Sequence, residues 1–189
     1  MALTSIALCS RALMKLGADS ITSFEDGTAE AEVAASLYGP TRDALLSAYP
    51  WSFATGQISL ARLAAEPVAD YAYAYQLPSD FLRVLSAGVG GRGRGIDYRI
   101  AERRLHTDAS QVTLTYIFRP DEQTFPPFFD QALIVRLAAE FCIPLTDSTT
   151  RSEVLTRLAE SGFQQAKIID GQQESSVHLE DFSLVEVRS

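Results

Sequence analysis

The chain has 189 residues, a formal net charge of −8 and a hydrophobic fraction of 47%. This length suits one ordinary domain or two small ones with a buried core. The composition excludes a largely disordered chain, a collagen-like chain and a disulfide-stapled scaffold. We expect no membrane anchor, because no apolar run approaches the roughly 20 residues that cross a bilayer. We expect no secretion signal, because polar and basic residues are spaced through the N-terminus and no cationic start precedes an apolar block. The acidic balance disfavours a dedicated nucleic-acid reader, since such proteins gain most of their affinity from basic residues that neutralise phosphates.

Residues 1–50 have the apolar spacing of helices. A first helix is predicted to end at Gly17, where glycine suits a left-handed cap. Thr28 is the expected N-cap of a second helix, and Pro50 stops it. Within the second helix Pro40 removes a backbone donor and clashes with the preceding turn, so a kink or two abutting helices are expected there.

Residues 52–119 change to the pattern of strands, with alternating or β-branched and aromatic segments. They predict a small, mostly antiparallel sheet that includes a hairpin. The expected strands fall within residues 57–63, 72–78, 81–85, 97–101, 103–107 and 112–118.

Residues 121–170 return to helical spacing. One helix is expected to begin at Pro126-Pro127 and to end at Pro144. Thr150 to Glu153 fits a capping box for a second helix, which Gly171 ends. Residues 172–189 mix apolar and acidic side chains and form an expected C-terminal arm.

The order helix–strand–helix predicts an α+β fold. We expect a four-helix-type bundle, built from the N- and C-terminal helices, with a small antiparallel β-sheet inserted between them. The predicted organisation is one α+β domain over residues 1–171 and an extended arm over residues 172–189.

The search for catalytic chemistry returns weak signals. Residues 88–93 match G-x-G-x-x-G, but a strand pattern follows where a dinucleotide site needs a helix, so we interpret them as a mobile loop. His106 and His178 lack nearby partner ligands. Cys9 and Cys142 fall on apolar helix faces, as buried thiols do. We therefore expect no catalytic residues, no cofactor and no metal site, and hence no enzyme.

Two non-catalytic features stand out. The segment from Arg83 to Arg104 holds six arginines against two acidic residues. It is either a solvated hairpin face or a basic interaction loop, extending over residues 88–95, that meets phosphate or an acidic neighbour. The candidate contact residues in and beside this loop are Arg92, Arg94 and Arg99.

The second feature is the arm. Its apolar residues either pair with a neighbouring subunit, for instance by strand addition, or fold back on the chain's own helices. The candidate arm contacts are Leu179, Phe182, Leu184, Val187 and Arg188.

The run from Leu37 to Ala54 and the segment from Tyr75 to Arg83 resemble the tail tubular protein A family, the head-to-tail adaptors of short-tailed phages. Similar order and spacing extend along essentially the whole chain. The residues that carry the signature are Pro50, Trp51, Phe53, Leu77, Pro78 and Asp80. Pro40 departs from the family, which usually keeps an uninterrupted helix at that position.

The resemblance implies a structural virion protein located at the head–tail junction and made in the bacterial host cytoplasm. It implies a homo-oligomeric ring, a dodecamer, with the portal protein on one side and the tail nozzle protein on the other. DNA would pass through the ring during ejection and make only transient, non-specific contacts. Trp51 and Phe53 are expected to be core residues that anchor the helices on the sheet.

Other classes of function remain open from the residues alone. The alternatives are a small soluble α+β ligand-binding or regulatory domain, and an enzyme whose site is not recognised. An enzyme or a ligand-binding protein would need a concave pocket with perturbed titratable groups. A monomeric regulatory domain would have its arm packed on itself.

Overall fold

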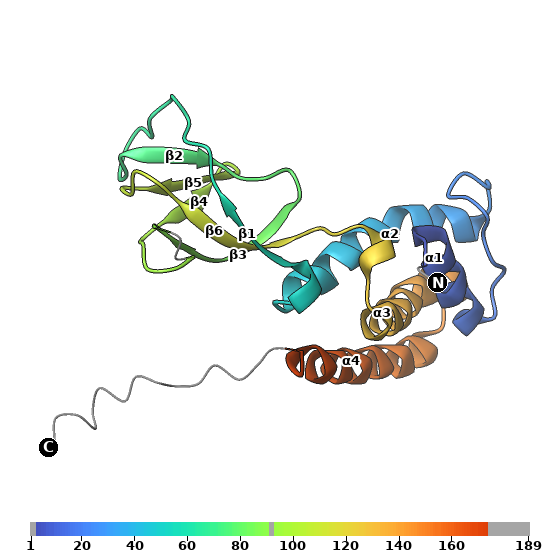
Figure 1. Ribbon diagram of the computed structural model, residues 1–189. Coiled ribbons are helices and arrows are strands. Elements are labelled where there is room, and N and C mark those ends of the chain that lie inside the picture. Colours follow the sequence, from blue (N-terminus) through green and yellow to red (C-terminus); the bar gives the residue numbers. More distant parts are fainter. Residues whose placement is uncertain (1–2, 91–92, 174–189) are drawn as a thin grey trace, which may run out of the picture.

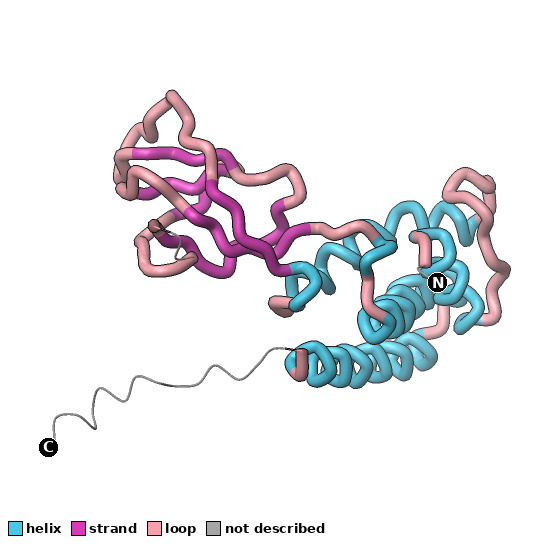
Figure 2. The backbone as a smooth tube through the Cα atoms, in the orientation of Figure 1, coloured by secondary structure: helices cyan, strands magenta, loops and turns pink. Residues whose placement is uncertain are grey.

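The computed structural model describes residues 3–90 and 93–173. The molecule is elongated, with the helices gathered at one end and the strands at the other (Figure 1). Figure 2 shows that the chain passes from helices into strands and back into helices. The predicted α+β class is therefore confirmed. No helix in the described part of the chain is both long and apolar enough to span a bilayer.

The two N-terminal helices begin and end where local chemistry places them. The Thr4 hydroxyl caps α1 (Ser5–Leu16), and Gly17 ends it with a φ of 74°, which glycine adopts readily. The Thr28 hydroxyl accepts a hydrogen bond from the Ala31 amide and caps α2 (Ala29–Ala48).

Helix α2 runs unbroken through Pro40, so the expectation of two abutting helices is wrong. Pro40 is exposed, and so is Ser36, whose carbonyl is the helical partner that proline cannot bond. Because that carbonyl lies on the solvent side, water can satisfy it and the helix continues.

The C-terminal helices are α3 (Pro127–Thr146) and α4 (Thr149–Gly171). The prediction that Pro144 ends α3 is wrong, since this exposed proline lies inside the last turn and Asp147 caps the helix in the left-handed region. The predicted capping box of α4 is also wrong, because Ser148 supplies the N-cap by accepting a hydrogen bond from the Arg151 amide.

Helix α3 is the centre of the helical body, which we define as α1 to α4. It packs against the other three helices, and buried residues occur all around it. Helix α4 lies at the outer side of the body (Figure 1) and packs chiefly on α3.

The strands form two three-stranded antiparallel sheets, ordered β1-β6-β3 and β2-β5-β4, where one sheet was predicted. Short 3-10 turns, η1 (Ser52–Ala54) and η2 (Glu122–Thr124), join the strands to α2 and α3. The strands are β1 (Thr55–Ser59), β2 (Tyr73–Gln76), β3 (Phe81–Gly88), β4 (Arg99–Ala101), β5 (Arg104–Thr107) and β6 (Thr113–Phe118). We call residues 52–119 the β module.

The two sheets share one small core. Single bridges pair Arg62, which follows β1, with Tyr75 of β2, and pair Gly88 of β3 with Gly95, which precedes β4. Side chains of both sheets, among them Tyr75, Leu105 and Leu114, are buried in the same cluster. The β module therefore has a core of its own, although Ile117 of β6 belongs to the buried cluster of the helices.

Candidate functional site

Trp51 lies at the joint between the helical body and the β module, directly before η1. Its side chain is fully buried, and its indole N–H donates a 3.1 Å hydrogen bond to the carbonyl of Leu45. The ring meets Phe129 of α3 and Phe163 of α4 edge-on, with centroids 5.2 and 5.7 Å away. As expected, Trp51 is a core residue. The same buried cluster includes Ile117 of β6, and Leu82 and Leu85 of β3 pack against it. Trp51 therefore lies in the core that joins the helices to the sheet β1-β6-β3.

Phe53, in η1, extends this aromatic cluster toward the strands. It is half-buried, and its ring lies 5.0 Å from Phe129 and 6.0 Å from Phe125. Pro50 is exposed and follows the C-cap residue Tyr49 of α2. The signature residues Pro50, Trp51 and Phe53 thus fix the direction in which the chain leaves α2 and enters the β module.

A buried carboxylate ties the end of α4 to the same joint. Asp170 is 2% exposed, and its two oxygens accept hydrogen bonds from the Ser52 amide at 3.0 Å and the Ser52 hydroxyl at 2.7 Å. These bonds connect residues 118 positions apart in the chain. The contact holds the first residue of η1 against the last turn of α4.

An ion-pair network lies on the other side of the joint. Arg42 of α2 donates to Asp43 at 3.0 Å and to Glu122 of η2 at 2.9 Å. Asp43 also accepts from Arg119, which directly follows β6, and Glu122 accepts from the Tyr38 hydroxyl. The network connects α2 to the segment through which the chain returns from the β module to α3.

The titration of these groups follows from the network. Partial burial alone would raise the pKa of Asp43, but hydrogen bonds from Arg119 and Arg42 outweigh it and hold the pKa below its ordinary value. The pKa of Glu122 is lowered as well, because its hydrogen bonds, including those from Tyr38 and Arg42, outweigh its burial. Both carboxylates are therefore charged at neutral pH and form the ion pairs that connect α2 to the segment between β6 and α3.

The second part of the signature lies inside the β module. Leu77 is 3% exposed and belongs to the core shared by the two sheets. The Pro78 carbonyl accepts from the Phe81 amide in the turn between β2 and β3. The Asp80 carbonyl accepts from the Arg119 amide at 2.9 Å, so this turn also contacts the end of β6.

The basic loop of residues 88–95 is anchored to the sheet through Gly93. The Gly93 carbonyl accepts from the Ser86 hydroxyl of β3 and from the Thr115 hydroxyl of β6. This contact corrects the interpretation of the loop as mobile throughout. Arg94 and Arg99 are exposed, with Arg99 paired to Asp70 at 3.4 Å, and Arg92 lies outside the described residues.

Gly93 cannot carry a side chain without displacing the loop. A Cβ at this position would lie 2.2 Å from Thr115 Oγ1 and 2.7 Å from Gln57 Nε2. Gly93→Ala is expected to lower the free energy of unfolding by about 1–2 kcal/mol, because overpacking forces the neighbours to move. Chemical denaturation measures the change.

The matched control for that variant is Gly162→Ala in α4. A Cβ there meets nothing within 4 Å, so alanine is expected to raise the free energy of unfolding by about 0.5–1 kcal/mol through its higher helix propensity. Equal effects of the two substitutions would contradict the anchored position of the loop.

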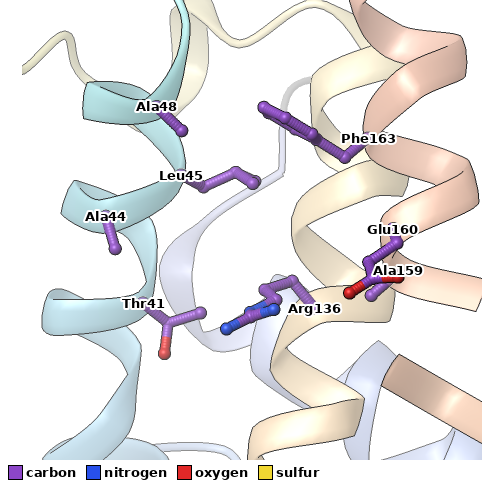
Figure 3. Close-up of a pocket in the computed structure, with 8 residues that line it drawn as sticks. All are labelled: Thr41, Ala44, Leu45, Ala48, Arg136, Ala159, Glu160 and Phe163. Atoms are coloured by element: carbon purple, nitrogen blue, oxygen red, sulfur yellow. The ribbon is translucent and has the colours of Figure 1, made fainter. Parts of the chain in front are cut away.

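A groove lies between α2 and α4 above α3. We call it the α2–α4 groove, and its volume is about 220 Å³. Leu45 and Phe163 point toward each other across it from α2 and α4 (Figure 3). Arg136 of α3 and Glu160 of α4 lie toward one end, so the groove is apolar in the middle and charged at that end. Its lining residues are Thr41, Ala44, Leu45, Ala48, Arg136, Ala159, Glu160 and Phe163.

Asp130, in the first turns of α3, is a buried carboxyl with an unpaired oxygen. It is 8% exposed, and its Oδ1 has no hydrogen-bond partner. Burial raises its pKa to about 6, and the charge of Arg11 offsets this only in part. The folded state therefore holds this proton more tightly than the unfolded state does.

The contribution of Asp130 to the free energy of unfolding is expected to fall as the pH rises through the interval between the ordinary pKa of 3.8 and about 6, because only the folded state resists ionising Asp130. Asp130→Asn removes this dependence. The free energy of unfolding of the variant minus that of the wild type is expected to be about 1–2 kcal/mol larger at pH 8 than at pH 4. Denaturant titrations at both pH values measure this, with the exposed Asp121→Asn as control. The same difference between variant and wild type at both pH values would contradict the raised pKa of Asp130.

Among the described residues, the thiols and the imidazole considered for catalysis lie in different parts of the molecule. Cys9 and Cys142 are fully buried in the helical body, and burial raises the pKa of the Cys9 thiol to about 12. His106 is half-buried on β5 in the β module, and His178 lies outside the described residues. Within residues 3–90 and 93–173, no group of three or more His, Cys, Asp or Glu side chains is placed to hold a metal ion.

The arm contacts proposed from the sequence, Leu179, Phe182, Leu184, Val187 and Arg188, also lie outside the described residues. Residues that sequence reasoning missed are Asp170, Arg42 and Glu122. Arg42 and Glu122 are 80 positions apart, and Asp170 is 118 positions from Ser52, so no local spacing signals these contacts. Asp170 does carry one usable signal, because a carboxylate in the last turn of a helix is unfavourable unless something binds it.

Comparison of the chain with protein-family models and with curated proteins found no match in either case.

Proposed function

We propose that this chain is a structural adaptor that forms a ring at the head–tail junction of a short-tailed phage. The ring would lie between the portal protein and the tail nozzle protein, and DNA would pass through its channel. The observation that carries the proposal is the placement of the residues that resemble the tail tubular protein A family. Pro50, Trp51 and Phe53 lie at the joint between the helical body and the β module, where they hold the two parts in one orientation.

A rigid joint suits an adaptor because an adaptor must contact different partners at separate surfaces. The helical body and the β module lie at opposite ends of the molecule (Figure 1). The aromatic cluster around Trp51, the Asp170–Ser52 contact and the ion pairs of Arg42 all restrain the angle between the two ends. A molecule with this fixed angle holds the partner at one end in a defined orientation relative to the partner at the other end.

The charge distribution also supports the proposal. The β module carries eight arginines and six acidic residues, a net charge of +2, which leaves −10 for the rest of the chain. An acidic body suits a conduit that must not retain DNA, because a basic lining binds phosphates. The exposed arginines Arg94 and Arg99 remain candidates for contact with a neighbouring subunit or with the DNA.

Ring formation needs two different complementary surfaces on each copy. Heterologous contacts of this kind close into a ring when the rotation between copies permits it. In the proposed assembly every copy is equivalent, and twelve copies is the number that the resemblance implies.

The proposal is tested by mixing the purified chain with its cognate portal and measuring the mass of the product by light scattering. A complex that contains one portal ring and many copies of the chain is the expected result. A chain that stays monomeric in the presence of the portal would overturn the proposal and favour a regulatory or ligand-binding domain. The chain without portal serves as the control, because a free adaptor can be monomeric.

A further inference from the structure

The α2–α4 groove is an apolar surface that the described residues leave uncovered. Leu45 and Phe163 face each other across it, and Ala44 and Ala48 of α2 are exposed along its side (Figure 3). Its volume of about 220 Å³ is below the roughly 300–1,000 Å³ of small-molecule pockets. Apolar side chains of a peptide segment fit such a space better than a cofactor does.

The described chain ends close to this groove. The Asp170–Ser52 contact fixes the last turn of α4 beside the end of α2, and a Cβ on Gly171 would lie 3.7 Å from the Tyr49 hydroxyl. Tyr49 follows Ala48, which lines the groove. The described chain therefore ends, at Gln173, beside one end of the groove.

We propose that residues 174–189 dock into the α2–α4 groove of their own chain. The segment contains six apolar residues that can enter the groove. Leu179 and Phe182 are separated from Gln173 by the number of residues that best suits the distance to the groove. The six are Val177, Leu179, Phe182, Leu184, Val185 and Val187.

The length of the segment permits this docking. From Gln173 back to Phe163 the helix measures about 15 Å, at about 1.5 Å per residue. Phe182 is nine residues beyond Gln173, a reach of about 30 Å at about 3.3 Å per residue. Enough chain remains for a reversing turn before Phe182 meets the groove.

Charge favours the same occupant. Residues 174–189 hold four acidic residues and one arginine, a net charge of −3. Lys167, one of two lysines in the chain, lies at the end of the groove nearest the chain exit, with its Nζ 5.3 Å from the Tyr49 ring and 5.5 Å from the Phe163 ring. Arg136 lies toward the other end and is itself paired with Glu140 at 2.7 Å, so Lys167 carries most of the attraction. Glu160 is the one acidic side chain among the lining residues.

Docking in the same chain covers two apolar surfaces at once, the groove and the segment. Both surfaces would otherwise be open to a second copy. The docked segment therefore acts as an intramolecular block to self-association. If the proposed adaptor function holds, release of the segment would accompany ring assembly.

The test uses Ala44→Glu in the full chain, with Ala35→Glu as matched control. Ala44 lines the groove, and glutamate there fills it and repels the acidic segment while keeping helix propensity. Ala35 is an equally exposed alanine of α2, nine residues earlier and thus about 180° around the helix. Hydrogen–deuterium exchange of the amides of residues 177–187 is measured at a protein concentration where light scattering shows a monomer.

The wild type and Ala35→Glu are expected to exchange these amides at least tenfold more slowly than Ala44→Glu. Phe182→Ser is expected to match Ala44→Glu without any change in the helices. Unprotected exchange in the monomeric wild type would overturn the proposal. Protection of these amides only at concentrations where light scattering shows an oligomer would also overturn it, because a second copy would then supply the groove. The measurement needs no portal, so its outcome is independent of the adaptor function.

Discussion

Replacing Trp51 with alanine is expected to lower the free energy of unfolding by about 3–5 kcal/mol. The side chain is fully buried among Tyr49, Phe129 and Phe163, so its removal leaves a cavity where three elements meet. It also leaves the carbonyl of Leu45 without the 3.1 Å hydrogen bond from the indole. Urea unfolding followed by circular dichroism measures the loss.

Trp51→Phe is the control for that experiment. Phenylalanine keeps an aromatic ring in the cluster but has no N–H, so a smaller loss of about 1–2 kcal/mol is expected. A loss below about 1 kcal/mol for Trp51→Ala would show that the joint does not depend on this ring.

Replacing Asp170 with alanine is expected to lower the free energy of unfolding by about 2 kcal/mol, the second large effect. The substitution leaves the amide and the hydroxyl of Ser52 without their acceptor, because both donate to this carboxylate, which is 2% exposed. The same substitution releases the end of α4 from η1. The loss is measured by the same unfolding titration.

A double-mutant cycle with Ser52→Ala isolates the contact. Ser52→Ala removes the hydroxyl bond of 2.7 Å and leaves the amide bond, so part of the effect of Asp170→Ala should disappear in the double variant. Strictly additive effects would contradict a direct Asp170–Ser52 interaction.

Much of the fold follows from local chemistry. Gly17 and Thr28 were predicted as helix caps and act as such, because a left-handed glycine and an N-cap hydroxyl are determined by nearby backbone groups. The predicted hairpin is present as β4 and β5. Its two-residue turn places Glu102 and Arg103 at positive φ, which the sequence does not signal.

The failures have physical reasons as well. Pro40 and Pro144 were expected to interrupt helices, but both lie on exposed sides where water can satisfy the one carbonyl that each leaves unbonded. Ser148 caps α4 instead of the predicted Thr150. The turn at Asp147 places the Ser148 side chain where it accepts a hydrogen bond from the Arg151 amide in the first turn of α4.

The candidate site was harder to predict than the fold. The aromatic residues Trp51 and Phe53 are prominent in the sequence, but their partners on α3 and α4 depend on tertiary packing. The α2–α4 groove arises from small residues such as Ala44 and Ala48, which have no distinctive pattern in the sequence. The ion pair of Arg42 and Glu122 joins residues 80 positions apart, and its partners could not be chosen among sixteen basic and twenty-four acidic residues.

Electron microscopy of the chain bound to its cognate portal tests the central claim most directly. The proposed adaptor function predicts a ring of this chain stacked coaxially on the portal ring, with an open channel through both. Each copy in that ring should keep the angle between helical body and β module that Trp51, Asp170 and Arg42 restrain. Portal rings without added density, or single copies attached without a ring, would contradict the proposal.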